Sequence, residues 1–600
     1  MKQIFTYILA AICIFAVAAC EKGTESEGKK PSGSSLLQGV TIEVIDIVTS
    51  ATTAQFSYKV DLGEASDMPI DVMLRYSYSK DFSGSSTQTV KLEKGDGIYV
   101  ISGLLFDRDY YYELYLSMYG TDYNGKNGGF KTKDVSVVMS EPSESSEGLI
   151  LSGKIEGVSV ADVSEFKAVL NVRDIAYGVV CEYNLSLADD MTFTKTVDGL
   201  DIGTAYTYWV DIRQGTQEPM SSEKKTYTTN DPYVDAEVEF AGAAIDLSAD
   251  GAANCYIVSS SGIYKFSLVK GNSNESVGAV TSVRVLWESF GTAEKPAALD
   301  LICGTFKDGE YAVFEVPQTF REGNAVIAAY DAQDNILWSW HIWLTDPIAE
   351  DTYYTVNPTT QEFTTEVAGV VMDRNLGALS NEPNEVGSFG LMYQWGRKDP
   401  FVGSAYLMQN SYAAATRRFK AVPGDSDYGN QEFATKNPNV FIAGNEEGDW
   451  LTQKNNGLWR GEAKTKTEND PCPPGWRIPD GGTGLNNVQA GLWAKIGLSA
   501  YGKTDFPNWY QRGWKGMTFQ ISDDEQSSWY PLAGGIGLNT ELKLVGVDGT
   551  YWTNLPVGGD KYEVYAMNFY ITGETSDVYY AFCSAEIPRA TGNSVRCCKE

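Results

Sequence analysis

The segment Asp470-Pro-Cys-Pro-Pro-Gly-Trp-Arg-Ile-Pro479 constrains the fold of this chain more than any other stretch. Proline fixes the backbone angle φ and withholds a hydrogen-bond donor, so a segment with four prolines forms neither a helix nor a central strand. We therefore predict a stiff connector that presents Trp476 and Arg477 to a hydrophobic core. Residues 347–600 are predicted to form a domain around this connector.

The N-terminal segment, residues 1–20, predicts an export signal. Lys2 precedes an apolar run that ends at Val17 and is too short to span a bilayer, and small residues lead up to Cys20. The sequence Val17-Ala-Ala-Cys20 resembles the bacterial lipobox. This resemblance implies acylation of Cys20, anchoring in the outer membrane through its lipid bilayer, and exposure at the cell surface. A plain signal peptide that ends in cysteine is the alternative. Residues 21–36 are polar up to Ser35 and predict a flexible tether.

Charge and cysteine content limit the partners and the compartment. The net charge of −32 argues against nucleic acid or an anionic phospholipid surface, because both attract basic patches. Nine cysteines behind an export signal predict an oxidising compartment. Removal of Cys13 with the signal and acylation of Cys20 leave seven, so at least one thiol stays unpaired. We expect Cys181, in an apolar strand, to be a buried free thiol.

Residues 101–133 and 197–229 repeat one pattern. In each, a Gly-Leu pair precedes by six residues a tyrosine, Tyr110 or Tyr206, which opens a strand of alternating polarity, and a strand bearing threonine follows. Such short alternating strands predict antiparallel sandwiches. The pattern resembles the fibronectin type III family, in which the tyrosine packs at a corner of the sandwich. The resemblance covers residues 37–135 and 147–230, with a polar linker at 141–147. It implies a fold and no ligand. We interpret the two sandwiches as spacers; ligand binding by their loops is the alternative.

Residues 231–346 are predicted to form a third β-sandwich-like unit that ends in a hairpin of strands 323–330 and 336–344. In the second of these strands, period two puts four apolar residues on one face: Trp338, Trp340, Ile342 and Leu344. His341 lies on the other face with Ser339 and Trp343. It is the only histidine, so no histidine pair for zinc exists, and we expect it to be structural. Cys255 and Cys303 are a candidate disulfide.

Six motifs in the last domain occur in a recognisable order: Val371–Ala378, Gly390–Phe401, Asp470–Pro479, Trp529–Gly535, Gly549–Thr553 and Ser594–Cys597. Together they resemble the Fibrobacter succinogenes major paralogous domain, a family of exported and often lipid-anchored bacterial proteins. The third unit resembles a module that often precedes this domain in lipoproteins of Bacteroidota. One departure is Ile478-Pro-Asp480, where the family has Leu-Pro-Thr. A glycine-rich insert also delays an expected helix around residues 488–496.

The Gly475-Trp-Arg-Ile-Pro479 phrase also resembles the formylglycine-generating and C-type lectin-like superfold, which implies sugar or protein binding. Aromatic faces stack on pyranose rings, so the candidate ligand-binding residues are Trp509, Trp514, Trp529 and Trp552. Core packing of these indoles is the alternative. Glu382-Pro-Asn384 matches a tripeptide of calcium-dependent lectins, and calcium is the one cofactor considered. Its usual Trp-Asn-Asp partner is missing, which favours coincidence. No other metal or cofactor is expected.

The terminal cysteines allow a disulfide hypothesis. Adjacent Cys597 and Cys598 point to opposite faces of a strand, so only one of them can pair with Cys472. A hairpin turning at 588–592 would bring Cys583 opposite this pair. We predict Cys472–Cys597 with Cys583–Cys598, against two other pairings of the same four cysteines.

The sequence therefore predicts a mainly β, multidomain protein: tandem antiparallel β-sandwiches followed by a loop-rich α+β domain, for which the C-type lectin-like fold is the candidate. The expected function is that of a non-catalytic, lipid-anchored cell-surface protein whose last domain binds a polysaccharide, other glycan or surface protein in adhesion. A structural or tip subunit of a fimbria-like assembly is the alternative. No catalytic constellation is recognisable, and the 79 acidic residues offer too many carboxylate pairs to select one for glycoside hydrolysis.

Overall fold

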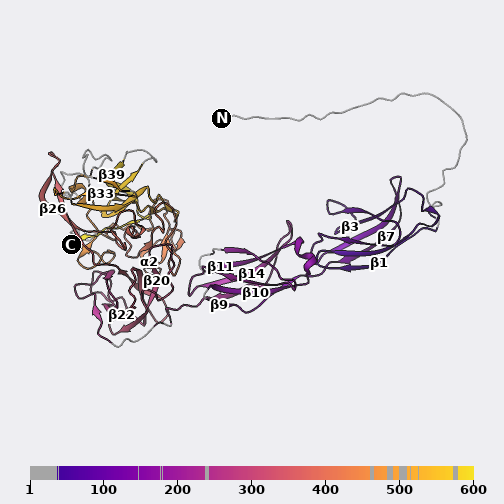
Figure 1. Cartoon of the computed structure of the whole chain (residues 1–600), viewed down its shortest axis with the longest axis horizontal. Coiled ribbons are helices and arrows are strands. Elements are labelled where there is room, and N and C mark those ends of the chain that lie inside the picture. Colours follow the sequence, from indigo (N-terminus) through magenta and orange to yellow (C-terminus); the bar gives the residue numbers. More distant parts are fainter. Residues whose placement is uncertain are drawn as a thin grey trace, which may run out of the picture.

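The computed structural model describes residues 37–600 apart from 38, 146, 176–177, 179, 235, 237–241, 358, 460–464, 483–490, 499–509, 514, 525 and 572–578. The protein is mainly β and multidomain, and its sheets are largely antiparallel. Two elongated sandwiches follow one another as a stalk, and the rest of the chain forms a broader head (Figure 1). The export signal, Cys20 and the tether lie outside the described residues. No helix in the described ranges is long and apolar enough to cross a membrane.

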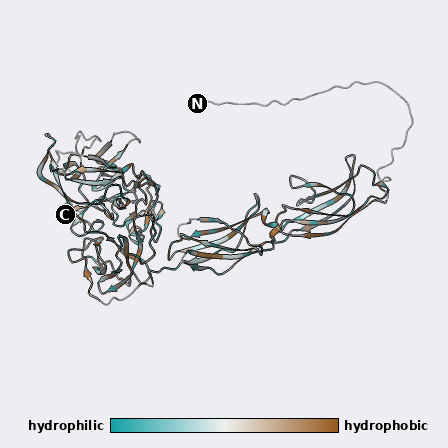
Figure 2. Cartoon of the chain, in the orientation of Figure 1, coloured by the Kyte–Doolittle hydropathy of each residue, from teal (hydrophilic) through white to brown (hydrophobic). Residues whose placement is uncertain are grey.

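The first sandwich packs a three-stranded sheet, β1-β2-β5, against a four-stranded sheet, β4-β3-β6-β7. Its elements are β1 Thr41–Thr49, β2 Ala54–Asp61, η1 Gly63–Ala65, β3 Asp71–Ser77, β4 Gln88–Leu92, β5 Gly97–Ile101, β6 Asp109–Met118 and β7 Thr121–Lys131. Alternate residues of β2 are buried, so the strand contributes Phe56, Tyr58 and Val60 to one core. Hydrophobic and hydrophilic residues accordingly alternate along the stalk strands (Figure 2).

The second sandwich repeats this layout with sheets β13-β10-β8 and β12-β11-β14-β15; β9 joins β10, and β16 joins β14. Its elements are β8 Ser136–Met139, β9 Ser143–Ser145, β10 Gly148–Glu156, η2 Val160–Glu165, β11 Lys167–Asp174, β12 Val180–Asn184, β13 Thr192–Val197, β14 Ala205–Arg213, β15 Met220–Ser221 and β16 Lys225–Thr228. The structure corrects the prediction of a linker at 141–147, because β9 lies within this segment and pairs with β10 of the second sandwich. Polar side chains suit this short edge strand, whose residues are all exposed.

The two repeats share the predicted tyrosine contact. The Tyr110 hydroxyl accepts a hydrogen bond from the Leu105 backbone N–H at 2.9 Å, and the Tyr206 hydroxyl accepts one from Asp201 at 2.9 Å. Thr132, directly after β7, also holds this loop: its Oγ1 donates a hydrogen bond to the Leu105 carbonyl at 2.6 Å. The repeated sequence pattern thus corresponds to one repeated corner.

The third unit is a sandwich of two four-stranded sheets, β17-β19-β22-β21 and β18-β24-β23-β20. Its strands are β17 Ile245–Asp246, β18 Cys255–Val258, β19 Gly262–Ser267, β20 Ser282–Ser289, β21 Gly304–Asp308, β22 Tyr311–Val316, β23 Gly323–Tyr330 and β24 Ile336–Leu344. The predicted hairpin is β23 and β24. The predicted face of β24 is confirmed, since its four residues Trp338, Trp340, Ile342 and Leu344 all enter the core between the sheets.

The opposite face of β24 packs on the last domain. Trp343 belongs to a second core that continues into residues of that domain, and its indole N–H donates to the Ala378 carbonyl at 3.0 Å. Ser339 donates to Asp399 at 2.6 Å. All eight residues of β23 are buried, as expected for a strand covered on both faces. The third unit and the last domain therefore form one head with a shared core.

The described residues of the last domain form four sheets: β25-β26-β41-β31; β28-β27-β40-β37-β38-β39 with β35 and β36 attached; β29-β30; and β32-β33-β34. Its first elements are β25 Glu350–Val356, β26 Phe363–Met372, η3 Val386–Ser388, β27 Leu391–Gln394, β28 Phe401–Val402, β29 Lys420–Val422, α2 Gln431–Lys436, β30 Val440–Ile442, β31 Trp476–Arg477, α3 Leu492–Lys495, β32 Tyr510–Gly513 and β33 Gly516–Gln520. The remainder are β34 Ser527–Pro531, β35 Gly535–Ile536, β36 Leu542–Lys543, β37 Asp548–Pro556, β38 Glu563–Ile571, β39 Tyr579–Pro588, β40 Gly592–Ser594 and β41 Cys598–Lys599. The short α3 lies within the expected helix region, of which residues 488–490 fall outside the described ranges.

The proline-rich connector is held by hydrogen bonds within itself and by one from the third unit. Its only strand is the two-residue β31, at the edge of a sheet. The buried Asp470 carboxylate accepts hydrogen bonds from the backbone N–H groups of Cys472 and Ile478, at 2.9 and 3.0 Å. The Asp470 carbonyl accepts from Asn254 of the third unit at 2.9 Å. Cys472 and Ile478 are buried. Trp476 packs against the core shared with the third unit, as predicted, although its side chain is half-buried, and Arg477 is also half-buried.

The predicted disulfide Cys472–Cys597 is present and joins the connector to the end of the chain. The predicted Cys583–Cys598 bond is wrong, because both residues carry thiols. The expected hairpin does not form: β39 lies at the edge of the large sheet, whereas the next strand, β40, crosses to its middle and pairs with β27. Cys598 then continues in another sheet, beside β26.

The other two cysteine expectations also need correction. Cys255 and Cys303 are not bonded to each other. Cys255 lies on β18 and belongs to the core shared with the last domain, while Cys303 precedes β21 in the opposite sheet. Cys181 carries a thiol as predicted but is half-buried, because β12 is the edge strand of its sheet.

Candidate binding site

A cavity of about 480 Å³ opens where the second sandwich meets the head. Its walls come from all three neighbouring units. Gly199 belongs to the second sandwich and Lys295 to the third unit, while the last domain contributes the segment 412–421 together with Phe401, Phe441 and Ile536. We call this cavity the junction pocket.

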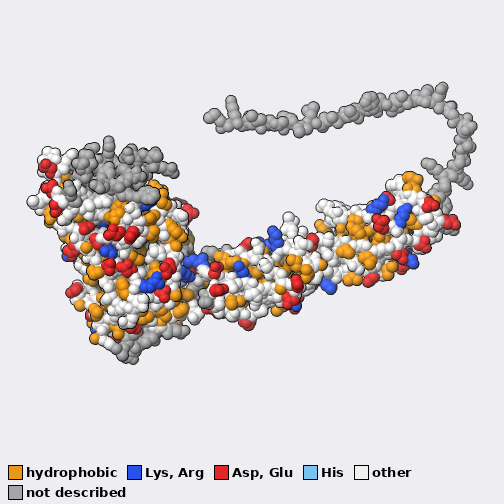
Figure 3. Space-filling view, in the orientation of Figure 1, with side chains coloured by type: hydrophobic (Ala, Val, Ile, Leu, Met, Phe, Trp, Pro, Cys, Tyr) orange, Lys and Arg blue, Asp and Glu red, His pale blue; other side chains and the backbone are white. Residues whose placement is uncertain are grey.

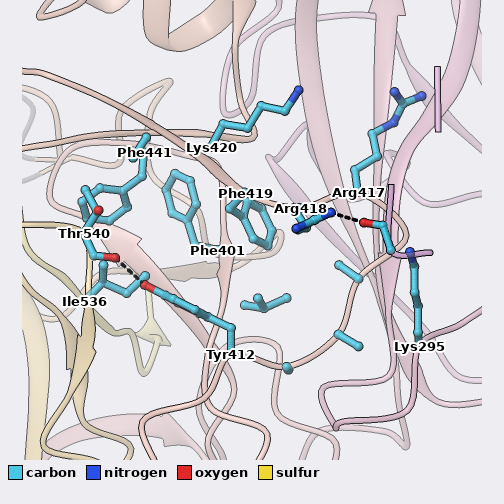
Figure 4. Close-up of a pocket in the computed structure, with 16 residues that line it drawn as sticks. Lys295, Phe401, Tyr412, Arg417, Arg418, Phe419, Lys420, Phe441, Ile536 and Thr540 are labelled. Carbon is cyan, nitrogen blue, oxygen red and sulfur yellow. Dashed lines mark hydrogen bonds between the residues drawn. The ribbon is translucent and has the colours of Figure 1, made fainter. Parts of the chain in front are cut away.

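One side of the junction pocket is aromatic. The ring centroid of Phe401 lies 5.4 Å from that of Phe419 and 5.2 Å from that of Phe441, both with edge-to-face geometry. Phe401 and Phe441 are buried in a core of the last domain, so the rings have a fixed backing. Tyr412 closes this side by donating its hydroxyl hydrogen to the Thr540 carbonyl at 2.9 Å (Figure 4). Burial, with the nearby Glu541 carboxylate, raises the Tyr412 pKa to about 12, so its hydroxyl stays protonated at neutral pH.

The other side of the junction pocket is cationic. Four basic residues line it: Lys295, Arg417, Arg418 and Lys420. None of the described lining residues is acidic. Figure 3 shows Lys and Arg side chains where the stalk meets the head, although acidic side chains dominate the chain as a whole.

Three of these cations also hold the head on the stalk. Arg417 pairs with Asp231 and donates to the Ile202 carbonyl at 2.9 Å. The Arg418 backbone N–H donates to Asp201 at 2.8 Å, and its guanidinium donates to the Gly199 carbonyl. The Lys420 ammonium lies 3.2 Å from Asp174. The short basic segment 417–420 is therefore both the joint and part of the pocket wall.

The tryptophans predicted to bind ligand are not brought together at this pocket. Trp552 is fully buried and donates its indole N–H to the Tyr393 carbonyl at 2.7 Å. Trp529 is also buried, with 6% of its surface exposed. Neither ring presents a free face, which corrects their assignment as stacking residues. Trp509 and Trp514 lie outside the described residues.

The remaining candidate features have local structural roles. His341 is buried, and burial lowers its pKa to about 3, so the ring is neutral. Its Nε2 lies 2.9 Å from Asn324 Oδ1, and because the Asn324 amide donates to the Gly377 carbonyl, Oδ1 is the acceptor. Glu382 lies in an exposed loop. No group of three His, Cys, Asp or Glu side chains among the described residues could hold a metal ion.

The junction pocket was not predicted from the sequence. Its one sequence signal was Ala413-Ala-Ala-Thr-Arg-Arg-Phe-Lys420, a basic cluster behind small residues in an acidic chain. That signal does not reveal the partners, since Gly199 and Lys295 are more than a hundred residues away in sequence.

No known protein family and no curated protein matches the chain. Among solved structures, the chain is similar to a segment of two fibronectin type III domains from chicken tenascin. The identity is 14% and the TM-score 0.17, over 32% of this chain and 98% of that one. It is also similar to the chicken interferon gamma receptor alpha chain, with 10% identity and a TM-score of 0.17 over 32% of this chain and 97% of the receptor chain.

Proposed function

We propose that this protein is a non-catalytic, lipid-anchored binding protein of the bacterial cell surface. Its two sandwiches would serve as a stalk that carries the head away from the membrane. The ligand, a glycan or another surface component, would occupy the junction pocket. The observation that supports this proposal is the pocket itself: about 480 Å³ is within the range of small-molecule sites, and its walls combine a rigid aromatic side with a few polar groups.

The lipid anchor is tested by cell fractionation. The chain with Cys20→Ser should leave the membrane fraction, because acyl chains on Cys20 are the only anchor that this proposal supplies. A substituted protein that still partitions into detergent with the membrane would refute the anchor.

The binding role is tested with the soluble Cys20→Ser chain and a panel of glycans and small surface components. A ligand that binds only the folded state raises the unfolding temperature in proportion to the logarithm of its concentration. Ala414 lines the pocket, so Ala414→Phe should fill it and remove this stabilisation. The proposal fails if no compound stabilises the protein, or if every stabilising compound acts equally on Ala414→Phe.

A further inference from the structure

The binding role proposed above for the junction pocket leads to a statement about its ligand. We infer that the pocket selects an amphipathic anion: an aryl or short acyl group that carries a carboxylate. The inference follows from three properties of the pocket: its size, its aromatic side and its cationic side.

Size limits the ligand. A cavity of about 480 Å³ is within the range of small-molecule sites, roughly 300 to 1,000 Å³. A small molecule fits this space. A long oligosaccharide does not, so only the end of such a chain could enter.

The aromatic side calls for an apolar group. Phe401, Phe419 and Phe441 line this side, and none of these side chains can hydrogen-bond. Phe419 is half-buried and offers contact surface, whereas Phe401 and Phe441 are 1% and 3% exposed. The hydroxyl hydrogen of Tyr412 is already donated to Thr540. Of the two ligand classes proposed above, this side disfavours the glycan, because a sugar ring placed here would leave several hydroxyl groups without partners. A hydrocarbon ring or chain would instead bury its surface at no such cost.

The cationic side calls for a negative group. Lys295 and Arg418 lie on the side of the pocket away from Phe401 and Phe441 (Figure 4). The Arg418 side chain is 58% exposed and shares its charge with Asp201 at 3.6 Å. Lys295 is exposed and makes no ion pair within the described part of the chain. A carboxylate between these two groups gains charge-assisted hydrogen bonds while its apolar part reaches the rings.

The test uses isothermal titration calorimetry on the full Cys20→Ser chain with matched probes. The anionic probes are 2-naphthoate, which has a ring, and decanoate, which has a chain. The neutral control is 2-naphthamide, of nearly the same shape, and the cationic control is decyltrimethylammonium. We expect at least one anion to bind with a Kd of about 10⁻⁴ to 10⁻⁵ M, as a ligand of this size can. Tighter naphthoate would identify an aryl ligand, and tighter decanoate an acyl ligand; either result supports the inference.

Three substitutions and one matched control locate the binding and assign the charge. Lys295→Gln and Arg418→Gln should each weaken the tighter anion about three- to tenfold and leave the neutral amide unchanged. Lys59→Gln is the matched control, because Lys59 is an exposed lysine of the first sandwich. It changes the net charge equally and should have no effect. Ala414→Phe should abolish binding of both the anion and the amide.

The possible failures separate this inference from the binding role. If the amide or the cation binds the pocket as tightly as the anions, the anionic class is wrong while the pocket remains a binding site. The anionic class is also wrong if an uncharged or cationic compound from the panel stabilises the wild type but not Ala414→Phe. If the anions bind equally to Ala414→Phe, they bind elsewhere, and the inference falls. If neither these probes nor the panel bind, both the inference and the proposed function fall.

Discussion

In the stalk, each sandwich closes around its own core, whereas in the head two units share one. Among the described residues from Leu37 to the end of β7, the apolar side chains in or against the core of the second sandwich are those of Ala51 and Phe106, and the joint between the sandwiches is made largely by hydrogen bonds. The Asp162 carboxylate of the second sandwich, for example, accepts from Ser50 at 2.7 Å and from the Thr52 backbone at 3.1 Å. In the head, the side chains on the two faces of β24 belong to two different cores.

This difference indicates two kinds of cooperativity. A module whose core contains only its own residues can unfold without exposing the apolar surface of its neighbour. The third unit cannot, because seven of its residues belong to the core shared with the last domain: Cys255, Leu286, Trp287, Val326, Ala328, Tyr330 and Trp343. We therefore expect the two stalk sandwiches to unfold as separate units and the head to unfold as one. The following predictions test this contrast, beginning with the largest effect.

Removal of the disulfide should weaken the head alone. The bond Cys472–Cys597 closes a loop of 125 residues, and the chain-entropy model gives up to about 5 kcal/mol for such a loop. Cys472→Ala should lower the calorimetric transition of the head and leave both stalk transitions in place. Cys181→Ala, which removes a half-buried thiol from the stalk, is the control. A stalk transition that moves with Cys472→Ala would contradict the separation of the two regions.

Mild acid should weaken the head through His341. Burial lowers its pKa to about 3, against 6.5 for an exposed histidine, so protonation favours the unfolded chain. The stabilising effect of the neutral ring is complete above pH 6.5 and is lost as the pH falls below it, by about 2 kcal/mol at pH 5. The stability advantage of the wild type over His341→Asn should shrink by this amount between pH 7.5 and 5.

The variant is needed because other groups titrate in the same range. Burial raises the pKa of Asp449 to about 6, which changes stability with the opposite sign. This contribution is common to both proteins and cancels in their difference. Urea denaturation at each pH gives the two free energies of unfolding. An unchanged difference would show that His341 can be protonated in the folded head.

The two tyrosine corners should act independently. Tyr110→Phe leaves the Leu105 backbone N–H without its acceptor, and Tyr206→Phe does the same to Asp201. Each loss should cost about 1–3 kcal/mol. Each substitution serves as the control for the other, since calorimetry should show only the sandwich that carries it becoming less stable. Equal shifts of both stalk transitions would mean that the sandwiches unfold together.

Local patterns in the sequence predicted local structure well. The spacing from Leu104 to Tyr110 identified the corner of each sandwich, and period two separated the two faces of residues 336–344. In both cases, the decisive contact depends on the geometry of one strand or turn. The Cys472–Cys597 pairing is confirmed, but it was predicted together with a hairpin and a Cys583–Cys598 bond that do not form.

Contacts between distant segments could not be predicted in this way. A strand with two apolar faces indicates burial on both sides but does not say what covers the second face. The indole N–H of Trp395 donates to the carbonyl of Thr553, 158 residues away, and such contacts decided which tryptophans are buried. The junction pocket needs three units at once. The sequence analysis therefore assigned ligand binding to tryptophans, of which Trp529 and Trp552 are buried.

The shared core of the head is tested most directly by dividing the head at residue 346. Residues 231–600, 347–600 and 37–230 are produced separately and heated in a scanning calorimeter. We predict one cooperative transition for 231–600, and two transitions for 37–230 at the temperatures of the full chain. Residues 347–600 should show no cooperative transition, because the cut exposes the surface that Trp343 and Val326 cover. If 347–600 unfolds cooperatively at the temperature of the intact head, the two units are independent and the shared core does not hold the head together.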